Sequence, residues 1–100
     1  MKYNKLVRDK IPEIIIKSGG KPKIHIARKN EYWLKLKEKL REEVEEFIKD
    51  ESETELADIL EIVDAIASFK KWSKINLDKV EKDRVKKRGG FKKRIILEES

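Results

Sequence analysis

The fold is decided by residues 40–60, which read LREEVEEFIKDESETELADIL. Apolar residues recur at helical spacing on both sides of a short polar stretch at residues 50–53, and this predicts two helices joined by a tight turn. Outward from it, the pattern predicts one helix over residues 30–49 and another over residues 54–71. Ser52 or Thr54 is expected to cap the second helix, and Ser52 with Glu55 fits a capping box.

The second of these helices is apolar around much of its circumference, so we expect it to be central. In a chain of 100 residues such a helix would leave part of its apolar surface exposed. The sequence therefore predicts a homodimer or a higher homo-oligomer. Four aromatic residues are expected in the core, with stacking on a nucleotide base as the alternative: Tyr32, Trp33, Phe69 and Trp72.

Shorter elements flank the two central helices. Pro12 fits the first turn of a helix that runs to Ser18 and ends at the glycine pair 19–20. Asn76 is expected to cap a last helix over residues 77–87, while residues 21–27 and 91–97 are predicted to be extended pieces that could pair. The expected fold is a single all-α domain over residues 1–100, with about four helices and short extended terminal segments.

Four carboxylates lie at or beside positions where a helix normally buries apolar side chains. Glu43 is on the shoulder of the first apolar stripe with Glu46 beside it, and Glu55 and Asp58 share the apolar face of the second helix. Their spacing is mirrored about residue 51, because Glu43 and Asp58 lie eight and seven residues from it and Glu46 and Glu55 lie five and four. An antiparallel helix pair therefore brings all four together. Burying unpaired carboxylates costs several kcal/mol, so the site should hold a cation.

These candidate ligands offer only oxygen atoms. The chain has no Cys and one His, His25, which has no partner nearby in the sequence. An oxygen-only set suits Mg²⁺ or Mn²⁺ rather than Zn²⁺. The alternative is a solvated acidic face, since Glu-rich helices are common. Glu61 and Asp64 form a further acidic pair on the more polar side of the same helix, as surface groups or as groups that face a partner.

Charge is strongly segregated along the chain. Residues 42–64 carry 11 acids and one base, whereas the other 77 residues carry 25 bases and nine acids. A metal–nucleotide complex would satisfy both the acidic block and the basic ends, although an acidic face with basic tails explains the charge as well. No apolar run approaches a membrane span and no signal peptide is visible, so a cytoplasmic protein that does not enter a membrane is expected.

The motif Glu42-Glu43-x-x-Glu46 followed by Glu55-x-x-Asp58 resembles the signature of the all-α nucleoside triphosphate pyrophosphohydrolases. That superfamily includes MazG-type enzymes, dimeric dUTPases and phosphoribosyl-ATP pyrophosphohydrolase. Residues 3–12 (YNKLVRDKIP) and 88–91 (RGGF) are similar to its small phosphoribosyl-ATP pyrophosphohydrolase-like "house-cleaning" branch. The resemblance covers essentially the whole chain, but the eight residues between the two acidic motifs are fewer than in many members.

The resemblance implies a MazG-like helical bundle, assembled as a dimer or a higher oligomer. It also implies Mg²⁺-dependent hydrolysis of a standard or modified nucleoside triphosphate to the monophosphate and pyrophosphate. The metal-binding acids carry over onto Glu42, Glu43, Glu46, Glu55 and Asp58, with Mn²⁺ as a possible substitute for Mg²⁺.

Within this mechanism, Glu42 or Glu46 would orient the attacking water or take its proton. The candidates for contacts with substrate phosphates are Lys5, Arg8, Lys10, Lys87 and Arg88. Arg8 and Arg88 are favoured because a guanidinium fork matches phosphate oxygens.

Three other interpretations remain. A nucleic-acid-binding module would use the basic ends, including the seven bases of residues 84–94, but leaves the mirrored acids unexplained. A non-catalytic regulatory dimer would keep the fold, and the intact acid set argues against it. The enzyme of histidine biosynthesis is less favoured, because the terminal motifs are closer to the house-cleaning branch.

Overall fold

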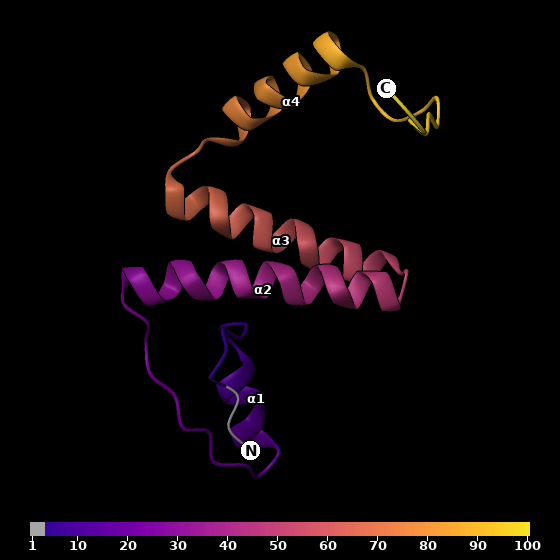
Figure 1. Ribbon diagram of the computed structural model, residues 1–100. Coiled ribbons are helices and arrows are strands. Elements are labelled where there is room, and N and C mark those ends of the chain that lie inside the picture. Colours follow the sequence, from indigo (N-terminus) through magenta and orange to yellow (C-terminus); the bar gives the residue numbers. More distant parts are fainter. Residues whose placement is uncertain (1–3) are drawn as a thin grey trace.

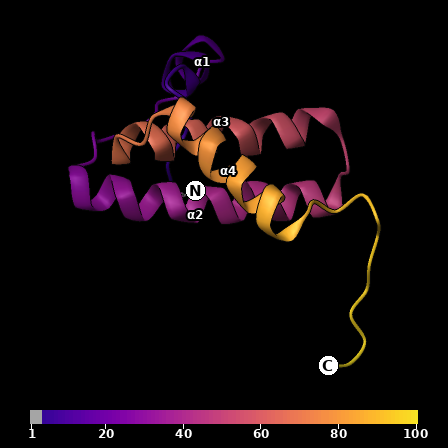
Figure 2. The ribbon, with the colours of Figure 1, turned by 90° about the horizontal axis from the view of Figure 1, so that it is seen from above.

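The computed structural model describes residues 4–100, which form four α-helices. They are α1 (Ile11–Lys17), α2 (Lys29–Lys49), α3 (Glu53–Lys70) and α4 (Lys74–Arg88). These residues contain no strand, so the predicted all-α fold is confirmed. The antiparallel α2–α3 hairpin is the centre of the structure, with α1 on one side and α4 on the other (Figure 1). Seen from above, α4 crosses the hairpin at an angle (Figure 2).

The hairpin forms where the sequence predicts it. Ser52 caps α3 through its hydroxyl, which accepts a hydrogen bond from the Glu55 backbone N–H at 3.2 Å. Leu36 of α2 is the one fully buried residue in the described part of the chain, with 1% of its surface exposed. The Phe69 ring stacks on Trp33 at 5.5 Å between centroids and meets Tyr32 edge-on at 5.4 Å. The hairpin is thus packed around one leucine and an aromatic cluster, whereas Trp72 is exposed and outside the core.

Helix α3 lies between α2 and α4 (Figure 1), and, as the sequence predicts for one chain, part of its apolar surface is exposed. No residue of α3 is fully buried, and Leu60 is 60% exposed. The physical reason is that α2 covers one face of α3 while α1 and α4 lie away from the opposite face (Figure 1). Apolar side chains of α3 consequently face solvent.

The start of α4 also differs from the prediction. Ser73, not Asn76, is the N-cap, and its hydroxyl accepts a hydrogen bond from the Asn76 backbone N–H at 3.1 Å. Because Ser73 is the cap, α4 begins at Lys74, and Asn76 lies within its first turn. Lys71 ends α3 in the left-handed conformation, with a φ of 60°, and this turns the chain toward α4.

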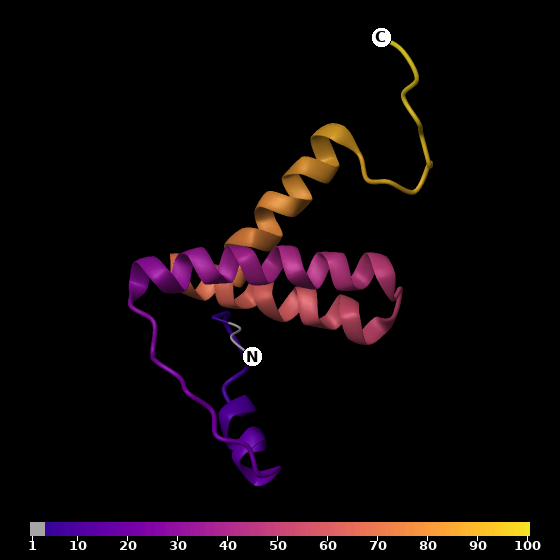
Figure 3. The same ribbon diagram turned by 60° about the horizontal axis from the view of Figure 1, so that its bottom comes forward.

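The expected pairing of residues 21–27 with residues 91–97 is wrong. Gly19 ends α1 with a φ of 91°, and the following stretch runs to α2 without a strand partner. The tail after α4 lies at the opposite end of the structure (Figure 3), because α4 carries it away from the hairpin. None of the helices in residues 4–100 combines the length and the hydropathy needed to cross a membrane.

Truncating Leu36 is expected to destabilise the hairpin. Leu36→Ala should lower the free energy of unfolding by about 2–5 kcal/mol, because it leaves a cavity at the one fully buried position. Urea denaturation at fixed protein concentration measures this loss. Leu34→Ala, at an exposed position of the same helix, is the control and should cost less than about 1 kcal/mol. Equal losses in the two variants would contradict this account of the core.

Candidate functional site

Three carboxylates converge between α2 and α3. Glu43, Glu55 and Asp58 each place an oxygen within 4.8 Å of the other two, and all three side chains are half-buried. We call this set the acidic triad. It arises because the short turn at residues 50–52 aligns the acids of α2 with those of α3. Glu46, the fourth predicted acid, is exposed and lies outside the triad.

The negative charge of the triad is only partly balanced by nearby basic side chains. Burial raises the pKa of Glu55 above its ordinary value, and repulsion from Asp58, Glu46, Glu43 and Asp50 raises it further. Within residues 4–100, no Lys or Arg forms an ion pair with Glu55. A cation placed among these three carboxylates would remove that repulsion.

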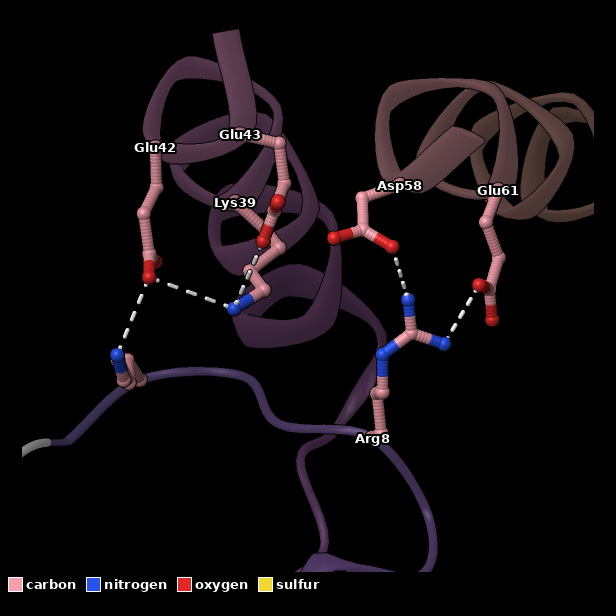
Figure 4. A network of polar contacts seen from close by, with 7 residues as sticks. Arg8, Lys39, Glu42, Glu43, Asp58 and Glu61 are labelled. Atoms are coloured by element: carbon pink, nitrogen blue, oxygen red, sulfur yellow. Dashed lines mark hydrogen bonds and ion pairs between the residues drawn. The ribbon is translucent and has the colours of Figure 1, made fainter. Parts of the chain in front are cut away.

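A stretch near the N-terminus, residues 5–9, runs past both acidic helices (Figure 4). We call it the N-terminal strap. Lys5 Nζ lies 3.1 Å from Glu42 Oε1 on α2. Arg8 reaches α3, where Nη2 lies 2.7 Å from Asp58 Oδ1 and Nη1 lies 2.6 Å from Glu61 Oε1. Two of the basic residues predicted from sequence are thus placed beside the predicted acids.

A further cation, Lys39, was missed by the sequence analysis. Its Nζ lies 3.3 Å from Glu43 and 3.5 Å from Glu42, on the same helix (Figure 4). Partial burial would raise the pKa of Glu42, but the hydrogen bond from Lys5 and the charge of Lys39 outweigh it and lower the pKa. The available signal was its spacing, because residues three and four apart on a helix are neighbours.

Glu61 was ranked behind the predicted ligands, yet it belongs to this region through its contact with Arg8. It follows Asp58 by one helical turn, and this spacing was the signal for it. Asp64, its partner in the second acidic pair, is exposed and does not line the cavity described next.

A cavity of about 220 Å³ opens between the strap and the hairpin. Charged groups line part of it, and Tyr32 and aliphatic side chains line the rest. Most small-molecule pockets measure roughly 300–1,000 Å³, so one chain encloses only part of a ligand of that size. Its lining residues are Leu6, Val7, Arg8, Asp9, Tyr32, Leu36, Lys39, Glu43, Asp58, Glu61, Ile62 and Ala65.

The other predicted phosphate contacts lie elsewhere. Lys10 is exposed at the start of α1. Lys87 and Arg88 lie at the C-terminal end of α4, where they line a separate hollow. This end of α4 points away from the α2–α3 hairpin (Figure 1). Tyr3, the first residue of the N-terminal motif, is outside the described residues.

Comparisons with known proteins add one relative. An uncharacterized protein of Mycolicibacterium smegmatis is 54% identical to this chain over 41 residues. The match covers 41% of the chain and 42% of that protein, so the chain spans less than half of the relative's length. No family model and no solved structure matches the chain.

Removing the positive charge of Lys39 should raise the pKa of Glu42. Lys39→Met leaves Lys5 as the remaining cation, so the pKa should move back toward the ordinary value for glutamate. An NMR titration of the side-chain carboxyl carbons measures this shift. Lys35→Met is the control, since Lys35 pairs with Glu38 one turn earlier and should leave Glu42 unchanged. A fall in the pKa of Glu42 in Lys39→Met would contradict the assignment.

Proposed function

We propose that this chain is a Mg²⁺-dependent nucleoside triphosphate pyrophosphohydrolase, which splits its substrate into the monophosphate and pyrophosphate. The observation that carries the proposal is the acidic triad, in which two helices bring three carboxylate oxygens within 4.8 Å of one another beside Arg8 and Lys39. The proposal includes membership of the all-α pyrophosphohydrolase superfamily, which the motifs of both acidic helices resemble.

The residues fit a hard divalent cation. The triad supplies only oxygen ligands, from half-buried side chains, and Glu55 has no basic partner in the described part of the chain. Mg²⁺ in proteins is commonly held by one or two carboxylates together with substrate phosphates, and Mn²⁺ accepts the same ligands. When bound, the metal would neutralise phosphate charge and lower the pKa of a coordinated water.

The two candidates for the group that orients or deprotonates water are not equivalent. Glu42 is held by Lys5 and Lys39, and its lowered pKa makes it a weaker proton acceptor. Glu46 is exposed, and no ion pair to it is found in residues 4–100. Its charge nonetheless acts on Glu55, so it lies close to the triad. We therefore favour Glu46 for this role.

Arg8 of the strap and Lys39 of α2 would bind substrate phosphates. Arg8 and Lys39 line the same cavity as the triad carboxylates Glu43 and Asp58. Arg8 offers a fork of N–H donors that matches phosphate geometry, and Lys39 offers a compact charge. The small volume of the cavity indicates that the base or the sugar would extend beyond what a single chain encloses.

We also propose that a second copy of the chain covers the exposed stripe of α3. Leu56, Leu60 and Val63 recur at helical spacing, and Val44 and Ile48 are exposed on α2. A stripe of this kind on an isolated chain favours association. A symmetric dimer would bury the stripe against the same stripe of its partner.

A second function keeps some support from the C-terminal basic stretch. The seven bases of residues 84–94 are exposed and remote from the triad (Figure 1), as expected for contacts with nucleic-acid phosphates. This alternative, with or without a regulatory role, leaves the acidic triad without a purpose. We therefore rank it below the enzyme.

Neutralising triad residues should abolish hydrolysis. Glu43→Gln and Asp58→Asn should each lower the rate at least about 100-fold, because each removes a carboxylate from the triad. Purified protein with Mg²⁺ and a panel of standard and modified nucleoside triphosphates is assayed for pyrophosphate and monophosphate. Glu45→Gln, an exposed acid of the same helix outside the triad, should retain activity. Absence of turnover with the whole panel in the wild type would reject the proposal.

A charge on the α3 stripe should disrupt the proposed assembly. We expect the wild type to have at least twice the mass of one chain in light scattering coupled to size-exclusion chromatography, and Leu60→Glu to have the mass of one chain. Val85→Glu places the same charge at a comparably exposed position of α4 and should leave the assembly intact. A monomeric wild type at micromolar concentration would reject self-association through this stripe.

A further inference from the structure

The guanidinium of Arg8 is divided between two carboxylates in different situations (Figure 4). Nη2 donates to Asp58, which belongs to the acidic triad, and Nη1 donates to Glu61, which does not. The Asp58 side chain is 27% exposed, whereas that of Glu61 is 60% exposed. One half of the fork thus sits on a candidate metal ligand, and the other half sits on a neighbour one turn along α3.

A divalent cation in the triad would compete with Arg8 for Asp58. It would draw on the oxygens of Asp58 and place two positive charges close to the guanidinium. The ion pair between Arg8 and Asp58 would then weaken, whereas the contact with Glu61, outside the triad, would persist. The hydrogen bond from Arg8 to Glu61 is also the largest cause of the raised pKa of Arg8, ahead of every contribution from Asp58.

Once a cation has weakened the ion pair between Arg8 and Asp58, the position of the Arg8 side chain depends on Glu61. The strap has no regular secondary structure at Arg8, and the Arg8 side chain is exposed. Lys5 also ties the strap to the hairpin, but its partner Glu42 lies on α2 rather than on α3. With Asp58 engaged by a cation, Glu61 is the one acid within residues 4–100 already in contact with Arg8 that can hold the guanidinium at the cavity.

We propose that Glu61 is a positioning residue, which holds Arg8 at the cavity while a divalent cation replaces the guanidinium on Asp58. The released Nη2 edge then faces the cavity and binds a phosphate oxygen of the triphosphate. Glu61 itself does not touch the substrate, since its charge repels phosphate. This inference rests on the proposed function, because it requires a cation in the triad.

The first measurement uses the cation alone. Mn²⁺ is titrated into the intact chain without nucleotide, and electron paramagnetic resonance reports the free ion. Arg8→Gln should bind Mn²⁺ severalfold more tightly than the wild type, because it removes the group that competes for Asp58. Glu61→Gln should stay within roughly threefold of the wild type, because Glu61 lies outside the triad and contacts Arg8 rather than a triad carboxylate.

The second measurement uses inorganic tripolyphosphate with Mg²⁺, a probe that lacks base and sugar, and isothermal titration calorimetry. Arg8→Gln and Glu61→Gln should each weaken binding about tenfold, and the double variant should bind no more weakly than Arg8→Gln alone. Asp64→Asn is the matched control, an exposed acid of α3 outside the cavity, and should bind like the wild type. Since Arg8 and Glu61 are both exposed, all variants should keep the helical circular dichroism of the wild type.

The outcomes separate the two proposals. If Mn²⁺ binds as expected but Glu61→Gln behaves like Asp64→Asn, or if the losses from Arg8→Gln and Glu61→Gln multiply, the positioning role is rejected and the metal site stands. If the wild type does not bind Mn²⁺ at all, the proposed function and the positioning role are rejected together. An unchanged affinity for Mn²⁺ in Arg8→Gln would reject the exchange on Asp58.

Discussion

Mutual repulsion among the carboxylates of the acidic triad is the constraint on which the arrangement around it depends. A turn of three residues sets the register of α2 against α3, and this register presses Glu43, Glu55 and Asp58 into one half-buried space. Two nearby cations offset part of this repulsion, since Lys39 pairs with Glu43 and Arg8 pairs with Asp58. Burial, and then repulsion from Asp58, Glu46, Glu43 and Asp50, raise the pKa of Glu55, and no Lys or Arg within residues 4–100 forms an ion pair with it.

The hairpin that carries the triad has a very small core of its own. Leu36 is fully buried, the ring cluster around Phe69 closes one end, and much of the remaining apolar surface of α3 is exposed. Leu6 is the one residue of the strap (residues 5–9) that is half-buried, and the exposed ion pairs of the strap contribute little stability. A chain built in this way has more to gain from covering α3 with a second copy than from strengthening its own interior.

Much of the fold was predictable because helical spacing and capping are local properties. The bounds of α2 and α3 lie within one residue of the prediction, and Ser52 caps α3 as expected. The errors have local or tertiary causes. Ser73, three residues before Asn76, takes the N-cap position of α4. Residues 21–27 and 91–97 do not pair because α4 carries the C-terminal tail away from the segment before α2 (Figure 3). The apolar circumference of α3 predicted that one chain would leave part of this helix exposed, but a hydrophobic pattern does not specify which of its residues those are.

The sequence by itself determined the helices and the level of the acids on them, since mirrored spacing about a short turn places Glu43 and Asp58 opposite each other in any antiparallel pair. Helical spacing also brings Lys39 to Glu43. Only the tertiary structure decided which cations arrive from the strap and which acid stays outside the triad. Lys5 and Arg8 are 37 and 50 residues from their partners Glu42 and Asp58. Glu46, although one turn from Glu43, is exposed. Helical periodicity acts over a few residues, whereas an ion pair across the chain depends on how the strap is laid against the hairpin, and no local pattern encodes that path.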